Sequence, residues 1–235
     1  MIKIEEVDIW GFKHAIRGMR NPMDSWDKSD SFQCDGVGCY FENCPEYKSN
    51  VEGCGHSGDY VVGSADLDLM HRFYVSGTEH RKFMRMIHVS MDVTAPLYWW
   101  KEYYTYKVGT VANSCSTMHK IHAKEFTLDD FSHEYLCGAS VDHLEMLIDW
   151  LNDCRKSYVE QKHKEDWWQM IQLLPSSYNQ RRTLDFNYET AVQIIRQRTG
   201  YKLDEWHTFV DVLLNLPYMR EIMNGQTGYG CGWVD

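Results

Sequence analysis

A strand that runs directly into a helix, near the middle of the chain, limits the fold most strongly. The segment IHVSMDV (87–93) alternates apolar and polar residues, and a period of two is typical of a strand with one buried face. Thr94 then stands where it can cap a helix that has Pro96 in its first turn and runs to about Tyr106. We therefore expect a strand that is followed at once by a helix.

The N-terminal part of the chain predicts further elements of both kinds. Residues 2–9 alternate loosely and predict an opening strand. A helix over Phe12–Arg20 follows, and it breaks at Asn21 because the next residue is a proline. Apolar residues between 67 and 74 fit a helix that stops near Gly77.

The C-terminal half is mostly helical by the same criteria. Residues 144–158 show helical spacing in a helix that Ser140 can cap, and a second helical stretch ends at Pro175. The remaining expected elements are a short strand at 183–186, a helix Tyr188–Arg198 capped by Asn187 and ended by Gly200, and a helix at about 203–214. Strands near the start and the middle, with helices around them, predict an α/β (α+β) fold with a mixed central sheet.

Length and composition restrict the function. The 235 residues suit one large domain or two small ones, and we expect a single domain, 1–235. A net charge of −10 disfavours a broad grip on nucleic acid. The N-terminus has no signal-peptide pattern and no apolar run is long enough to cross a membrane. Eight cysteines without such a signal predict reduced thiols and a cytoplasmic location.

A cysteine-bearing stretch at about 23–63 is expected to be an insertion over a site or a small metal-bound lobe. Its candidate ligands are Cys34, Cys39, Cys44, Cys54 and His56. Thiolates and imidazole suit zinc, but the spacing lacks the close pairs of structural zinc sites. We therefore predict no metal and treat a metal lobe as the alternative.

The polar segment KVGTVANSCSTMHK (107–120) is poor in large apolar side chains, so we do not expect it in the core. Around Cys115 its small hydroxyl residues can present donors to a phosphate. A thiol there is nucleophilic if nearby cations lower its pKa, whereas a solvated loop with an idle thiol is the simpler interpretation.

Two blocks of the chain, taken in order, resemble flavin-dependent thymidylate synthases. The first is HRKFMRMIHVSMDVTAPLYWWKEYYTYKVGTVANSCSTMHKI (80–121), in which a strand leads to an Ala-Pro helix start and then to the position of the family signature RHRxxSxxExSxRY. The second is LLPSSYNQRRTLDFNYETAVQIIRQR (173–198), in which a Leu-Pro pair, an asparagine and a helix ending in arginine keep the family spacing. AIRGMR (15–20) resembles a weaker N-terminal element of the family.

The signature itself is altered. Arg-His-Arg of the family corresponds to Thr105, Tyr106 and Lys107, and the second signature serine corresponds to Cys115. The resemblance implies flavin-binding residues, which are His80, Thr105, Tyr106, Lys107, Asn187 and Gln193. It also implies substrate-binding residues, which are Glu102, Ser114, Cys115, Ser116, Thr117 and Arg198. Of these, Arg198 and Cys115 are the candidates for a catalytic role.

The implied activity is reductive methylation of dUMP to dTMP, with FAD as cofactor and with NADPH and methylenetetrahydrofolate as co-substrates. The resemblance also implies a homotetramer with active sites between subunits. Two alternatives stay open. One is flavin-dependent modification of another pyrimidine nucleotide with Cys115 as nucleophile, and the other is a non-catalytic nucleotide- or metal-binding protein that kept the fold.

Overall fold

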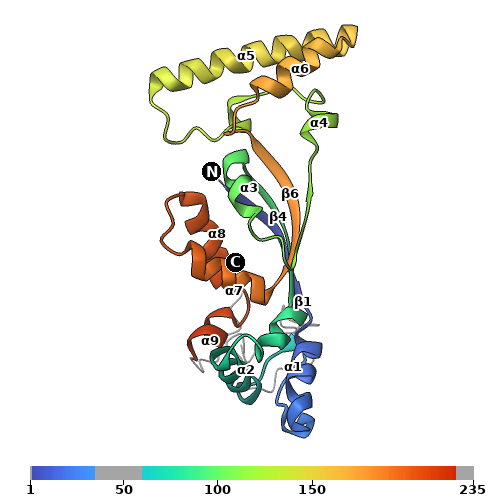
Figure 1. Ribbon diagram of the computed structural model, residues 1–235, viewed down its shortest axis with the longest axis vertical. Helices are drawn as coiled ribbons and strands as arrows, with labels where there is room; N and C mark the ends of the chain where they lie inside the picture. Colours follow the sequence, from blue (N-terminus) through green and yellow to red (C-terminus); the bar gives the residue numbers. More distant parts are fainter. Residues whose placement is uncertain (1, 35–59, 226–235) are drawn as a thin grey trace, which may run out of the picture. The chain divides into compact units, whose positions relative to one another are not determined.

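The computed structural model describes residues 2–34 and 60–225 (Figure 1). These residues form two compact units. Unit 1 consists of the described residues of Met1–Val7, Ser90–Lys107 and Val111–Asp185. Unit 2 consists of those of Asp8–Val89, Val108–Thr110 and Phe186–Asp235. Each unit is assembled from segments that are far apart in the sequence. The single domain expected from length stays a prediction.

Unit 1 holds most of a four-stranded sheet with the order β1-β4-β6-β5. The strands are β1 (Lys3–Trp10), β4 (His88–Pro96), β5 (Thr110–Ser114) and β6 (Asn179–Asn187). Together with the helices this is the mixed α/β architecture that the sequence predicts. The strands expected at 2–9 and 87–93 are confirmed as β1 and β4, and the strand expected at 183–186 is the second half of the longer β6.

The helix after β4 begins later than predicted. β4 continues to Pro96, with Val93 and Ala95 fully buried, and α3 spans Leu97–Tyr103. Thr94 therefore lies within the strand and caps no helix. The first amides of α3 are satisfied by backbone instead, because Leu97 N donates to Tyr178 O at 3.0 Å.

β5 was not predicted, because TVANS lacks an apolar alternation. It lies at the end of the strand order beside β6, and its side chains are largely exposed, with Val111 67% exposed. The prediction that the polar segment lies outside the core is confirmed.

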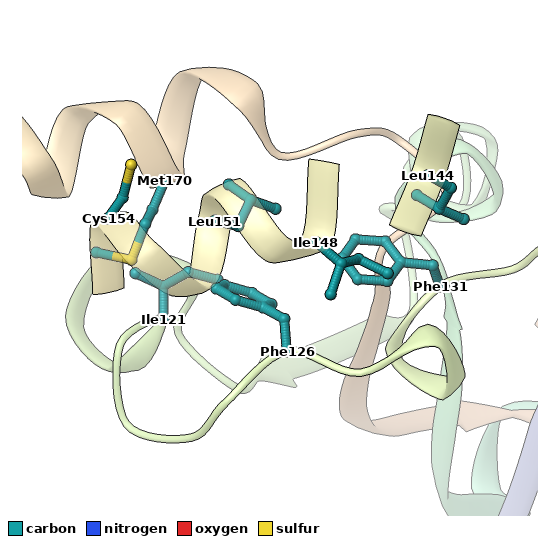
Figure 2. Close-up of a cluster of buried hydrophobic side chains, with 8 residues drawn as sticks. All are labelled: Ile121, Phe126, Phe131, Leu144, Ile148, Leu151, Cys154 and Met170. Carbon is teal, nitrogen blue, oxygen red and sulfur yellow. The ribbon is translucent and has the colours of Figure 1, made fainter. Parts of the chain in front are cut away.

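Helices make up much of the rest of unit 1. α5 (Gly138–Gln161) and α6 (Lys164–Leu173) pack against each other, and α4 (Thr117–Lys120) and a 3₁₀ turn η4 (Leu128–Asp130) precede them (Figure 1). α5 starts at Gly138 after Cys137, so the predicted cap at Ser140 is wrong. Figure 2 shows the buried cluster beneath α5, which comprises Ile121, Phe126, Phe131, Leu144, Ile148, Leu151, Cys154 and Met170.

Unit 2 is built from helices and short strands. Its helices are α1 (Phe12–Arg20), α2 (Ser64–Ser76), α7 (Tyr188–Arg198), α8 (Asp204–Leu214) and α9 (Met219–Asn224), with 3₁₀ turns η1 (Asn21–Met23), η2 (Trp26–Lys28) and η3 (Arg81–Met86). α2 packs on α9, α7 on α8, and α1 and α7 on η3. The predicted bounds of α1 and α7 are confirmed, whereas α9 was missed.

A buried ion pair fixes the segment that follows α1. Asp66 is fully buried in α2, and its carboxylate accepts from Arg20 Nε, Ser29 Oγ and Ser31 Oγ, each at 2.6 Å. Burial by itself would raise the pKa of this carboxyl, but the hydrogen bonds from the two serines and Arg20 outweigh it and hold the pKa below its ordinary value. Beyond Ser31, β2 (Phe32–Gln33) pairs antiparallel with β3 (Tyr60–Val61).

Candidate functional site

The residues predicted to bind ligands divide between the two units. Unit 1 contains Glu102, Thr105, Tyr106, Lys107, Ser114, Cys115, Ser116 and Thr117. Unit 2 contains His80, Asn187, Gln193 and Arg198.

In unit 2, Asn187 of the second resembling block (173–198) lies against Gly109 of the first (80–121). Its Oδ1 caps α7 by accepting from Thr190 N at 3.0 Å and Thr190 Oγ1 at 3.2 Å. Gly109, from the first block, has φ +78° and packs so closely that an added Cβ would lie 2.9 Å from Thr190 Oγ1 and 3.3 Å from Asn187 Nδ2. The altered signature therefore contacts the helix start that carries Asn187. Because Oδ1 serves the cap, Nδ2 is the group that Asn187 can offer to a ligand.

Arg198 ends α7 and is only 8% exposed. Its guanidinium carbon lies 4.4 Å from the ring centroids of both Tyr201 and Trp206. Cation–π contacts of this kind restrict the orientation of the guanidinium. Arg198 is thus not a loosely placed surface arginine that balances the helix dipole.

His80 and Gln193 are both exposed. The His80 ring lies 6.1 Å from the Phe73 ring, and its Nε2 is 3.7 Å from Glu79 Oε1. Tyr74, for which no role was predicted from the sequence, lies against two guanidinium groups, those of Arg81 at 4.5 Å and Arg196 at 5.1 Å. Arg196 also donates to the Tyr74 hydroxyl at 2.8 Å.

In unit 1, the three residues at the altered signature have different environments. Tyr106 is buried and belongs to the packing of α3, with its ring 6.1 Å from that of Tyr103. Thr105 is exposed, and its hydroxyl donates to Glu102 O at 2.9 Å. Lys107 is exposed. Thr105 and Lys107 are therefore accessible to a ligand, whereas the Tyr106 ring is part of the core.

The segment Ser114–Thr117 is held mainly through its backbone. Cys115 N donates to Arg181 O at 2.9 Å, and Cys115 O accepts from Gln180 Nε2 at 2.6 Å. Ser116 Oγ accepts from His119 N at 3.0 Å. The Cys115 side chain is exposed. The backbone around Cys115 is thus fixed while its thiol faces outward.

Two neighbouring arginines on β6 have opposite environments. Arg181 is exposed and forms an ion pair with Asp92, whose pKa is lowered by hydrogen bonds from Thr183 and Arg181. Arg182 is 6% exposed, and its guanidinium carbon lies 4.3 Å from the Trp100 ring and 4.8 Å from the Tyr104 ring.

The hydrogen-bond partners of the buried guanidinium are neutral. Arg182 Nε and Nη2 both donate to Gln180 Oε1, at 3.1 and 2.7 Å, and Nη1 donates to the Tyr104 hydroxyl at 2.6 Å. The sequence alone gives Arg182 no role, because a cluster of arginines around Asn187 is ordinary near a helix and the expected strand begins only at 183. A signal was present in the two polar side chains at alternate positions, 180 and 182, before Leu184 and Phe186.

No group of three or more metal-binding side chains gathers within residues 2–34 and 60–225. Of the proposed metal ligands, Cys34 is described, whereas Cys39, Cys44, Cys54 and His56 lie outside the described residues. No disulfide joins the cysteines in the described part of the chain, which are Cys34, Cys115, Cys137 and Cys154. A search of the described helices for one long and apolar enough to span a bilayer also finds none.

The fold is that of flavin-dependent thymidylate synthases. The chain is similar to the crystal structure of Thymidylate Synthase X (ThyX) from Helicobacter pylori with FAD and dUMP, with a TM-score of 0.62 and 13% identity over 96% of this chain and 98% of that one. A second structure of flavin-dependent thymidylate synthase ThyX from Helicobacter pylori, complexed with FAD and dUMP, gives a TM-score of 0.60 and 13% identity over 94% and 100% of the two chains. No protein-family profile and no curated protein sequence matches the chain. The resemblance and the fold class predicted from the sequence are confirmed at the level of the fold.

Proposed function

We propose that the protein is an FAD-dependent enzyme of the thymidylate synthase type. It would convert dUMP to dTMP by reductive methylation, with methylenetetrahydrofolate as one-carbon donor and NADPH as reductant. The observation that carries the proposal is the likeness, over nearly the whole chain, to two ThyX structures that contain FAD and dUMP. The contact of Gly109 with Asn187 supports it, because it joins the two blocks in which the resemblance was found.

The residues of unit 2 suit an anionic, planar cofactor. Asn187 offers an amide donor, the His80 ring is exposed, and the guanidinium groups of Arg81 and Arg196 lie beside Tyr74. In unit 1, Lys107 adds an exposed cation. When bound, FAD supplies the redox chemistry, whereas the protein binds and orients the reactants. The buried Tyr106 is the exception among the assigned residues, and we expect it to shape the site by packing.

Arg198 would bind the pyrimidine ring. A guanidinium presents fixed donors, and one that is already oriented can stabilise negative charge that develops on the ring. Its contacts with Tyr201 and Trp206 restrict its motion before any ligand arrives. Glu102 and the segment Ser114–Thr117 complete the proposed nucleotide-binding set, with the segment on the phosphate.

The cofactor part of the proposal is tested by the absorbance spectrum of the purified protein and by identification of the released compound. We expect a flavin spectrum and release of FAD. A colourless protein that takes up no added FAD would contradict the proposal and favour a non-catalytic protein that has kept the fold.

The substrate part is tested by Arg198→Ala and Arg198→Lys. We expect FAD content to persist while dUMP affinity or turnover falls about tenfold or more, the loss of one charge-assisted hydrogen bond. Lysine keeps the positive charge but lacks the planar set of donors of a guanidinium, so Arg198→Lys should recover little of the lost dUMP affinity or turnover. Arg72→Ala, at an exposed arginine on α2, is the matched control. Unchanged dUMP affinity in folded Arg198→Ala would assign Arg198 a purely structural role.

The expected homotetramer and cytoplasmic location belong to the same proposal. Light scattering of the FAD-loaded protein should give four times the 27.8 kDa chain mass. A monomeric holoenzyme with full activity would show that the active site is complete within one chain.

A further inference from the structure

Gln180 connects the buried arginine of β6 with the segment assigned to the nucleotide. It is 7% exposed, and its backbone oxygen and both polar atoms of its side chain form hydrogen bonds. Its backbone oxygen accepts from Trp100 Nε1 at 2.9 Å. Its side-chain oxygen accepts twice from Arg182, and its side-chain nitrogen donates to Cys115 O at 2.6 Å.

These contacts determine which way the Gln180 amide faces. A guanidinium can only donate hydrogen bonds, so the atom of Gln180 next to Arg182 must be the oxygen. The amide nitrogen must then face Cys115, where the carbonyl oxygen accepts. Without Arg182 the amide could rotate by half a turn and place its oxygen against the Cys115 carbonyl, which would repel it.

The same contact fixes the peptide plane after Cys115. A trans peptide holds its C=O and N–H in opposite directions. When Cys115 O faces Gln180, the Ser116 N–H therefore points away from Gln180. The orientation of this N–H, in a segment assigned to a phosphate, depends on the Gln180 amide and through it on Arg182.

Burying the Arg182 guanidinium costs free energy that an apolar side chain filling the same space would not cost. Buried cations are normally paired with an acid, and apolar residues of similar volume are often at least as stabilising. Arg182 occupies an alternate position of β6 whose later members are Leu184 and Phe186, both fully buried. Its contacts with Trp100, Tyr104 and Gln180 partly compensate the buried charge but include no carboxylate.

We propose that Arg182 is a positioning residue for nucleotide binding: it orients the Gln180 amide, which in turn fixes the Cys115–Ser116 peptide. The inference rests on the proposed function, because it assigns the segment Ser114–Thr117 to the nucleotide phosphate. Arg182 itself need not touch the ligand.

Gln180→Glu is the sharpest test. The carboxylate can still accept from Arg182 and gives the buried cation a counter-charge, but it cannot donate to Cys115 O. We expect the folded state and FAD content to persist, and dUMP to bind about tenfold or more weakly. Arg182→Met removes the orienting donors without a new charge and should act in the same direction. Gln172→Glu is the matched control, since it makes the same amide-to-acid change at an exposed position of α6.

Amide hydrogen exchange, measured without nucleotide, provides a second readout. The Cys115 amide bonds to Arg181 O and the His119 amide to Ser116 Oγ, so both should be protected in the wild type. We expect exchange at these amides to accelerate about tenfold or more in Gln180→Glu and Arg182→Met, and to stay unchanged in Gln172→Glu. Exchange elsewhere in unit 1 should not change.

The two readouts separate failure of this inference from failure of the proposed function. If the wild type binds dUMP and both variants bind it equally well, the positioning role is wrong. If the wild type binds no dUMP, the proposed function is wrong, and exchange alone decides whether Arg182 and Gln180 hold the segment. Unchanged exchange in both variants would overturn the inference in either case.

Discussion

Replacing Asp66 with asparagine tests the polar network that anchors the segment after α1. The substitution removes one negative charge with almost no change in shape. It leaves Arg20, whose side chain is 5% exposed, buried without its counter-charge. It also places an amide NH₂ among donors, because the backbone N–H of Ser31 at 3.2 Å cannot become an acceptor.

The expected loss is large compared with the total stability of a typical domain. Removing one partner of a buried ion pair destabilises a protein by about 3–5 kcal/mol. A typical folded protein is stable by only about 5–15 kcal/mol. For a chain of this length, about 1 kcal/mol corresponds to a shift in Tm of roughly 2–4 °C. Asp66→Asn should therefore lower Tm by about 6 °C or more.

Urea unfolding followed by tryptophan fluorescence, together with a thermal scan, measures the effect. Asp27→Asn is the control, because Asp27 is an exposed acid in the same segment and its replacement should change stability by less than about 0.5 kcal/mol. Arg20→Met combined with Asp66→Asn should be less destabilised than Asp66→Asn alone, since the unpaired cation is gone. A loss below about 1 kcal/mol in Asp66→Asn would refute the view that this network anchors the segment.

Four further outcomes are expected. Because the pKa of Asp66 is lowered in the folded state, its contribution to the free energy of unfolding is fully present above the unfolded-state pKa of about 4. That contribution is lost as pH falls through the folded-state pKa. Urea midpoints measured below about pH 4 should therefore fall more steeply with acidification for the wild type than for Asp66→Asn. Gly109→Ala should destabilise by about 1 kcal/mol or more, since φ is +78° and the new Cβ would lie 2.9 Å from a hydroxyl; an unchanged Tm would contradict this. Leu151→Ala, at a fully buried position of the cluster in Figure 2, should cost about 2–5 kcal/mol in urea unfolding. Cys115→Ser should retain turnover of dUMP if the flavin route operates, whereas lost turnover with intact binding would indicate a thiol that attacks the pyrimidine.

Local chemistry explains what the sequence predicted well. Asn187 and the amide that it caps are three residues apart, and Gly200, which follows α7, has φ +71°. Both signals act within one turn of the helix they delimit, so the surrounding structure does not change them. The predicted bounds of α7, and with them the placement of Arg198, were therefore reliable.

Contacts between residues that are far apart in the sequence explain the predictions that were wrong or missing. Thr94 had the chemistry of a cap, but Ser176 and Tyr178 satisfy the first amides of α3, and β4 continues through Thr94. β5 is short and polar, and it is a strand because it lies beside β6, which residue type alone does not report. The packing of Gly109 against Asn187 could likewise not be predicted from the sequence, since the two residues are far apart along the chain.

The part of β6 that was not predicted contains Gln180 and Arg182, the two residues of the further inference. The buried face of this strand contains Gln180, Arg182, Leu184 and Phe186, so a period of two exists along the whole strand. It was recognised only at 183–186, because a hydrophobic pattern does not count polar residues as buried. Gln180 and Arg182 can be buried because they hydrogen-bond to each other, while the Gln180 side-chain nitrogen donates to Cys115 O and Arg182 also donates to the Tyr104 hydroxyl. Sequences depart from such patterns most often at functional or strained sites. The polar pair that hides the start of the strand from a hydrophobic pattern is thus the pair that we infer to orient the segment Ser114–Thr117, which we propose binds the nucleotide.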